Sequence, residues 1–349
     1  MNKNHWILLL FIVPLLFLNC KDAGKKNVKG NAIPVIFDTD MGNDIDDALA
    51  LDMLYKYMDE GKINLLGIML NKNYLHSPEY IDIMGTWYGY PDIPVGILKT
   101  GEKLHTNDEN FTGRVAALTV NGKPAFERTI DDYNSLPDSY KLYRKLLSEQ
   151  LDNSVTVISV GFLTNLALLL ESSADEFSPL TGKELVAKKV KLLSIMAGSF
   201  TDELYAEYNI LINKSAATKT FAEWSSPIVA SPFELGDSIK YPGSSIKNDL
   251  SWTDLHPLVE GYRHFPREAN INYNRSTWDL TSVLYAVEPD SVYFSLSPKG
   301  FITSDENGYT QLTADENGKH QYLITNSEQR EAILNHFIKL ISRIPNKYK

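Results

Sequence analysis

Short apolar runs alternate with longer amphipathic segments from residue 33 to the end of the chain. Runs rich in β-branched residues are typical of buried parallel strands, and they cover 33–37, 65–70, 94–98, 155–160, 190–196 and 228–230. Apolar residues at helical spacing predict helices over 45–58, 77–88, 140–151, 165–172, 215–224 and 328–344. This alternation predicts one α/β domain over residues 33–349, with an open, doubly wound, mostly parallel sheet covered by helices on both faces.

The loop after the first predicted strand is strongly acidic. It lies in the stretch "VIFDTDMGNDIDDALAL", which contains Asp38, Asp40, Asp44, Asp46 and Asp47. Ligands of such sheets bind beyond the carboxyl ends of the strands. Helix capping accounts for Asp46 and Asp47, but Asp38 and Asp40 precede the helix. Carboxylates this close raise one another's pKa unless a cation compensates them. Because His and Cys are absent from the loop, its oxygen ligands favour Ca²⁺ or Mg²⁺ over zinc.

The net charge of the chain and its N-terminal segment indicate which partners the protein binds and where in the cell it is located. A formal net charge of -10 argues against nucleic-acid binding driven by the field of the whole protein. The apolar run at 6–18 is shorter than the roughly 20 residues that span a bilayer, and it is typical of a secretory signal. The only cysteine, Cys20, follows it after a single residue, Asn19. We therefore expect a signal peptide over 1–20, lipid attachment at Cys20, a tether over 21–32 and export to the cell envelope. An uncleaved anchor or a buried structural cysteine is the alternative.

The acidic stretch resembles the N-terminal signature of the inosine–uridine-preferring nucleoside hydrolase family, DTDxGxDDxxAL. It departs from that signature by two extra residues, Asn43 and Asp44, between the glycine and the paired acids. The resemblance implies a calcium-dependent enzyme with a nucleoside hydrolase-like fold. It implies these roles: Asp40 as calcium ligand and general base, Asp46 as a ribose-binding residue, Asp47 as a calcium ligand and Asp38 as a structural acid.

Three further stretches match the family in the same order, so that the resemblance extends over about 240 residues. "VISVGFLTNLALLL" supplies Thr164, whose backbone carbonyl ligates calcium in the family. "AEYNILINKSAA" supplies Glu207 and Asn209, which would bind ribose and would face one way if extended. "NRSTWDLTSVLYAV" supplies Asp279, which would complete the calcium shell at the start of an apolar helical run. Ordinary helix capping explains each of these motifs when it is taken alone.

Other positions depart from the family or leave a choice open. "GIMLNKN" offers Asn71 and Asn73 for ribose, and Asn73 is nearer the family spacing. Trp278 stands where several relatives have a histidine that protonates the leaving base. This tryptophan could stack on the base, or it could simply pack in the core. The segment 256–273 could form a mobile loop that supplies an acid from His264.

The resulting hypothesis is calcium-dependent hydrolysis of the N-glycosidic bond of ribonucleosides, which yields ribose and free base. A homo-oligomer is possible because relatives often form one. One alternative is a lipoprotein that binds nucleosides or pentosides without cleaving them. Another is a haloacid-dehalogenase-like phosphatase, suggested by "VIFDTD", although Met41 and Gly42 do not fit that motif.

Overall fold

The computed structural model describes residues 32–100, 111–201, 203–265 and 271–349. The expected signal peptide, Cys20 and all of the tether except Ala32 lie outside these residues. Within the described ranges, no helix combines the length and apolarity that crossing a membrane requires.

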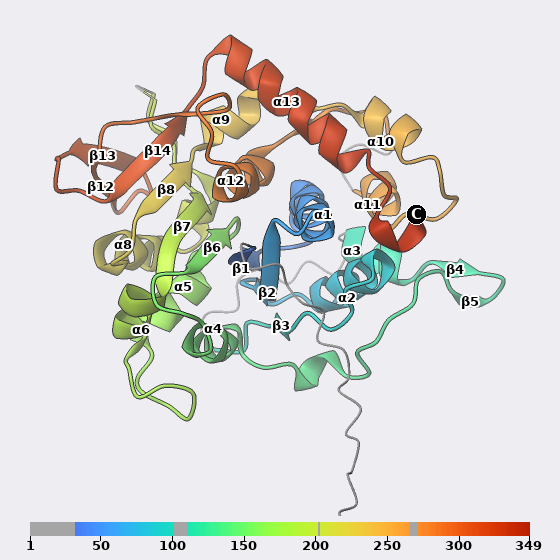
Figure 1. Cartoon of the computed structure of the whole chain (residues 1–349), viewed down its shortest axis with the longest axis horizontal. Helices are drawn as coiled ribbons and strands as arrows, with labels where there is room; N and C mark the ends of the chain where they lie inside the picture. Colours follow the sequence, from blue (N-terminus) through green and yellow to red (C-terminus); the bar gives the residue numbers. More distant parts are fainter. Residues whose placement is uncertain (1–31, 101–110, 202, 266–270) are drawn as a thin grey trace, which may run out of the picture.

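One large sheet organises the domain (Figure 1). Its strands are β1 (Ile33–Thr39), β2 (Ile63–Leu70), β3 (Val95–Gly96), β6 (Val155–Ser159), β7 (Val190–Met196), β8 (Ile228–Ser231), β11 (Ser295–Leu296), β12 (Gly300–Ser304), β13 (Thr310–Ala314) and β14 (His320–Ile324). Their order is β13-β12-β14-β8-β7-β6-β1-β2-β3, with β11 paired to β14. The segment from β14 to β3 is parallel throughout. The predicted mostly parallel, doubly wound sheet is therefore confirmed.

Helices cover both faces of the sheet, and each face has its own apolar core (Figure 1). β1 shows the alternation, because Val35 and Phe37 belong to one core and Ile36 to the other. The first face carries α1 (Asp46–Asp59), α2 (Ser77–Tyr88), α11 (Pro257–His264), α12 (Trp278–Val287) and α13 (Ser327–Ile341). The second face carries α4 (Ser139–Ser148), α5 (Thr164–Glu171), α6 (Gly182–Lys189) and α8 (Lys214–Glu223).

The remaining elements are short. They are α3 (Phe111–Ala116), β4 (Thr119–Val120), β5 (Lys123–Pro124), α7 (Tyr208–Ile212), α9 (Phe233–Ser238), β9 (Lys240–Tyr241), α10 (Gly243–Asp249) and β10 (Arg275–Ser276), with 3₁₀ turns at Tyr133–Ser135 and Asn346–Tyr348.

The expected alternation of strand and helix is wrong near the C-terminus. β11 to β14 follow one another without intervening helices, and β12 pairs antiparallel with both β13 and β14. β13 has the sequence TQLTA and is largely exposed at the edge of the sheet. A strand with one face in water does not need the continuous apolar run that marks the central strands.

Helix α1 follows the acidic loop and is almost entirely enclosed. Every residue from Asp46 to Tyr57 is buried, because α1 lies between the sheet and helices α11, α12 and α13 (Figure 1). Two of its buried side chains form an ion pair, in which Lys56 Nζ lies 3.0 Å from Asp52 Oδ1. Lys56 also donates to the carbonyl of Ile341 at the end of α13, and Asp52 accepts from the Tyr88 hydroxyl. These contacts fix the helix that follows the acidic loop.

We predict that Lys56→Met lowers the free energy of unfolding by about 3–5 kcal/mol, because it leaves the Asp52 carboxylate buried without a neighbouring cation. Urea unfolding followed by circular dichroism measures the change. The double variant Lys56→Met/Asp52→Leu should recover part of the loss. As a control, Lys219→Met removes surface ion pairs with Glu171 and Glu223 and should lower the free energy of unfolding far less. Equal losses for Lys56→Met and Lys219→Met would contradict the role of the buried pair.

Candidate active site

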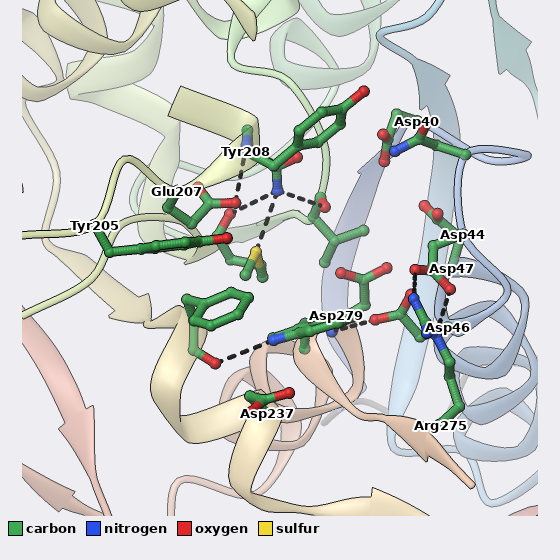
Figure 2. Close-up of a pocket in the computed structure, with 16 residues that line it drawn as sticks. Asp40, Asp44, Asp46, Asp47, Tyr205, Glu207, Tyr208, Asp237, Arg275 and Asp279 are labelled. Atoms are coloured by element: carbon green, nitrogen blue, oxygen red, sulfur yellow. Dashed lines mark hydrogen bonds and ion pairs between the residues drawn. The ribbon is translucent and has the colours of Figure 1, made fainter. Parts of the chain in front are cut away.

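A cavity of about 450 Å³ opens beyond the carboxyl ends of β1, β6 and β7 (Figure 2). The strand order reverses here, since β2 and β3 lie on one side of β1, and β6 to β8 lie on the other. Such a switch point separates the loops that follow adjacent strands and leaves room for a ligand. Seven carboxylic acids line the cavity: Asp40, Asp44, Asp46, Asp47, Glu207, Asp237 and Asp279.

The turn between β1 and α1 is held by its own polar groups. Gly42 has φ 102°, a left-handed conformation that favours glycine. The Asn43 N–H donates to the Asp40 carbonyl at 3.1 Å. The Thr39 hydroxyl donates to the Asp47 carboxylate and accepts from the Met41 N–H. These bonds place the acids of the turn at the cavity.

Asp46, Asp47 and Asp279 form a buried acid cluster in which one carboxylate oxygen of each residue lies within 4.8 Å of the others. Asp46 Oδ2 also accepts from the Asp279 N–H at 3.3 Å, although 233 positions separate the two residues. Burial raises the pKa of all three groups well above the ordinary value, and the neighbouring carboxylates raise it further.

The acid cluster fits a divalent cation. Among the described residues, no Lys or Arg side chain hydrogen-bonds to any of its three carboxylates. Buried carboxylates without such a partner are costly unless they are protonated or bind an ion. Oxygen ligands of this kind suit a hard cation such as Ca²⁺ or Mg²⁺. The cluster includes Asp46, which the resemblance assigned to ribose, so the division of roles between Asp40 and Asp46 stays a prediction.

Asp40 lies on the same cavity wall as the acid cluster. Burial raises its pKa to about 7, and the opposing charge of Lys72 offsets part of this rise. Lys72 follows β2, is buried, and its Nζ lies 3.4 Å from Asn43 Oδ1. The backbone at Gly161 also lies against the backbone of Asp40. A Cβ atom on residue 161 would lie 2.5 Å from the Asp40 nitrogen. The glycine of the "GFLTN" motif therefore permits a close approach to Asp40.

Glu207 occupies another part of the cavity wall, away from the acid cluster (Figure 2), and Asn209 lines the same cavity. They are not consecutive same-face residues of an extended segment, as the sequence suggested. Glu207 instead caps α7, and its carboxylate accepts from the Gly198, Asn209 and Ile210 N–H groups at 3.2, 2.8 and 3.3 Å. Burial raises the pKa of Glu207 to about 7, while these backbone donors lower it.

The Asn209 amide is oriented by two strand ends. Its Nδ2 donates to the carbonyls of Val160 and Met196, at 3.1 and 3.2 Å. The amide nitrogen is thus committed to the scaffold, and the amide oxygen is the atom suited to accept a hydrogen bond from a ligand.

An aromatic wall completes the cavity. Trp278 lies 5.5 Å from Phe233 between ring centroids, and Phe233 lies 4.4 Å from Tyr205. The Trp278 Nε1 donates to the Phe233 carbonyl at 3.0 Å. Trp278 therefore both packs against the core and borders the cavity, so the two alternatives for this residue are not exclusive.

Other sequence-predicted residues lie elsewhere. Thr164 and Asn73 are not among the described residues that line the cavity, and the Thr164 hydroxyl accepts from Asn213 at 3.0 Å. Asn71 is buried, donates to Asp38 and accepts from the Phe162 N–H. Asp38 itself also accepts from Asn165, as expected of a structural acid. The predicted roles of Thr164 and Asn73 stay predictions.

The proposed mobile segment 256–273 contains helix α11, so the expectation of a loop is wrong over 257–264. His264 ends this helix, lies 3.7 Å from Glu260 and is not among the described residues that line the cavity.

Sequence reasoning also missed Lys72, Phe233, Tyr205 and Arg275. Lys72 could have been found because it lies two residues beyond a strand, but the other three carry no recognisable local signal.

The fold and cavity define an α/β protein whose switch-point site joins an acid cluster to an aromatic wall. A family model for inosine-uridine preferring nucleoside hydrolases matches residues 35–333, and the chain belongs to this family. It is therefore a hydrolase that acts on N-glycosyl compounds. No curated protein matches the chain.

Solved structures share the fold at low sequence identity. A plant nucleoside hydrolase has 20% identity and a TM-score of 0.64, with coverage of 89% of this chain and 99% of that chain. A purine-preferring ribonucleoside hydrolase from Gardnerella vaginalis has 16% identity and a TM-score of 0.65, with coverage of 88% and 98%. An inosine-uridine preferring nucleoside hydrolase from Bacillus anthracis has 16% identity and a TM-score of 0.63, with coverage of 88% and 99%.

We predict that, in the presence of a chelator, the protein loses stability as pH rises from about 4 to 7. Burial raises the pKa of Asp40 from 3.8 to about 7 and moves the acid cluster in the same direction. The folded state therefore binds more protons than the unfolded state in this window, and raising the pH favours unfolding. A divalent cation bound at the cluster would offset this charge, so the rise in melting temperature on adding Ca²⁺ should be larger at pH 8 than at pH 5.

Differential scanning calorimetry with chelator and with Ca²⁺ measures both effects. The variant Asp46→Asn/Asp279→Asn should flatten the pH dependence in chelator, and the same substitution at an exposed site, Asp92→Asn, is the control. A Ca²⁺ effect that is equal at both pH values, or larger at pH 5, would contradict the prediction.

Proposed function

We propose that this protein hydrolyses the N-ribosidic bond of ribonucleosides in a calcium-dependent reaction that gives ribose and free base. The observation that carries the proposal is one cavity that joins Asp40 and the acid cluster to the Glu207–Asn209 wall. Family membership supports the reaction class. The three cluster carboxylates and Asp40 supply hard oxygen ligands, which support calcium as the ion.

Asp46, Asp47 and Asp279 would hold the ion, with Asp40 beside them. When bound there, a divalent cation would supply Lewis-acid chemistry, which would lower the pKa of a water and orient sugar hydroxyls. Asp40 accepts the proton of the attacking water, and a pKa near 7 suits a general base at neutral pH. The water oxygen bonds to C1′ of the sugar, the C1′–N bond breaks, and its electron pair leaves with the base, which takes a proton from solvent.

Glu207 and Asn209 contact the sugar in this proposal. The Glu207 carboxylate and the Asn209 amide oxygen are acceptors for sugar hydroxyls, and both are fixed by hydrogen bonds to backbone. Negative charge from Glu207 and the acids also stabilises the positive charge that develops on the sugar as the bond breaks. Because these groups are positioned before the substrate binds, little reorganisation is needed during the reaction.

Neither alternative function gains support. The matched family consists of hydrolases, which favours turnover over simple capture. The cluster is built from the tandem Asp46–Asp47 and the distant Asp279, which the phosphatase motif does not include.

We predict that Asp40→Asn lowers kcat for ribonucleoside hydrolysis at least about 100-fold, because it removes the general base while keeping the side-chain size. Release of reducing sugar from inosine, uridine, adenosine and guanosine, with Ca²⁺ or with chelator, measures turnover. Chelator should abolish activity of the wild-type chain, and Asp40→Asn should also weaken Ca²⁺ binding in calorimetry. Asp92→Asn, at an exposed site, is the matched control. Near-full activity of Asp40→Asn would show that another group takes the proton.

We also propose that the chain is exported and lipid-anchored at Cys20, which is supported by the apolar run at 6–18 that ends two residues before it. Cys20→Ser should abolish incorporation of labelled palmitate and release the protein from the membrane fraction. Retention of Cys20→Ser in the membrane fraction would instead favour an uncleaved anchor.

A further inference from the structure

Arg275 is a cavity residue that the proposed reaction does not use. It lies in β10, and its guanidinium forms a two-point ion pair with Asp44 (Figure 2). Nε donates to Asp44 Oδ1 at 2.8 Å, and Nη2 donates to Asp44 Oδ2. The guanidinium carbon also lies 5.1 Å from the Trp278 ring and 5.2 Å from the Phe265 ring. These contacts hold a planar group in one orientation at the cavity wall.

The partner of Arg275 comes from the unusual part of the acidic motif. Asp44 is one of the two residues by which this chain exceeds the signature DTDxGxDDxxAL. The pair joins positions 231 residues apart. The lengthened turn therefore supplies the carboxylate that orients the arginine.

The ion pair uses only part of the guanidinium. A guanidinium has five N–H donors, and Asp44 takes one from Nε and one from Nη2. The second N–H of Nη2 and both N–H groups of Nη1 have no hydrogen-bond partner among the described residues. The Nη1–Nη2 edge thus presents two parallel donors, and the side chain borders the cavity with 14% of its surface exposed.

The charge of the cavity limits what this donor edge can bind. Seven carboxylic acids surround the same space, so a phosphate or carboxylate ligand would meet repulsion at close range. A neutral group with two adjacent acceptors meets no such repulsion. The O6 and N7 atoms of a 6-oxopurine are such a pair, and they are the preferred two-point partner of arginine among the bases.

We propose that Arg275 selects nucleosides with a 6-oxopurine base, inosine and guanosine, by donating to O6 and N7 through its Nη1–Nη2 edge. This inference rests on the proposed function, since it names the base of the same riboside. Adenine offers N7 but places a donor at position 6, and a pyrimidine lacks the adjacent acceptor pair. A site built around such donors discriminates strongly, because the wrong base leaves them unpaired.

The test compares kcat/KM for inosine, adenosine and uridine in the wild-type chain and in Arg275→Lys, which keeps the charge but loses the planar fork. The wild-type chain should prefer inosine. Arg275→Lys should lower kcat/KM for inosine about tenfold or more, and that for adenosine less than about threefold. Arg343→Lys, which alters a more exposed arginine–carboxylate ion pair with Glu60 away from the cavity, should change none of the three values. Circular dichroism confirms that each variant is folded.

The outcomes separate this inference from the proposed function. Chelator-sensitive hydrolysis with an unchanged inosine-to-adenosine ratio in Arg275→Lys would overturn the role of Arg275 and leave the hydrolase intact. If no riboside is cleaved, the hydrolase proposal fails, and the same ratio measured by calorimetric binding of inosine and adenosine still decides the role of Arg275. A selective loss of inosine 5′-monophosphate binding would show that the edge holds phosphate, which contradicts the inference.

A substrate analogue tests the same contact without altering the protein. 7-Deazainosine lacks the N7 acceptor, so it should bind the wild-type chain about tenfold or more weakly than inosine. Equal binding of the two nucleosides would overturn the proposal even if Arg275→Lys fails to fold.

Discussion

Mutual repulsion among buried carboxylates is the constraint on which the site depends. Asp46, Asp47 and Asp279 are held within 4.8 Å of one another without a hydrogen-bonded basic side chain among the described residues. The folded chain can maintain this arrangement because the two helices that carry the acids, α1 and α12, are packed against each other and against the sheet. Apolar burial around these helices therefore offsets an unfavourable electrostatic cluster, which a divalent cation would then neutralise.

Different walls of the cavity carry different kinds of chemical groups. Acids and the Asn209 amide oxygen are suited to a hydroxyl-rich sugar and to the positive charge that develops on it. The Tyr205–Phe233–Trp278 wall and the Arg275 edge are suited to a flat, heteroaromatic group. A riboside has both parts, joined by the bond that the reaction breaks. The arrangement of the walls thus agrees with the reaction class of the family.

The irregular C-terminal strands also contribute to the site, although they lie at the edge of the sheet. The Ser199 N–H donates to the Thr310 hydroxyl at 2.9 Å, and that hydroxyl donates to the Ser199 carbonyl at 2.8 Å. Ser199 follows Gly198, whose N–H donates to Glu207. β13 therefore supports the loop that orients Glu207, which gives the exposed hairpin a structural link to the cavity wall.

The sequence by itself determined the fold class, the central strands and the location of an acidic site after β1. These features follow from local periodicity and from the rule that ligands bind beyond strand ends. Only the tertiary structure decided how Asp279 joins Asp46, that Glu207 caps a helix, and that Arg275 pairs with Asp44. The Asp279–Asp46 and Arg275–Asp44 contacts span more than 200 residues and depend on how helices pack against the sheet, and the spacing of residues along the chain contains no record of that packing. The Glu207 cap is local, but it also uses the Gly198 N–H of the preceding loop, which residue spacing does not reveal. The polar edge strands were missed for a related reason, since strands half in water need no continuous apolar run.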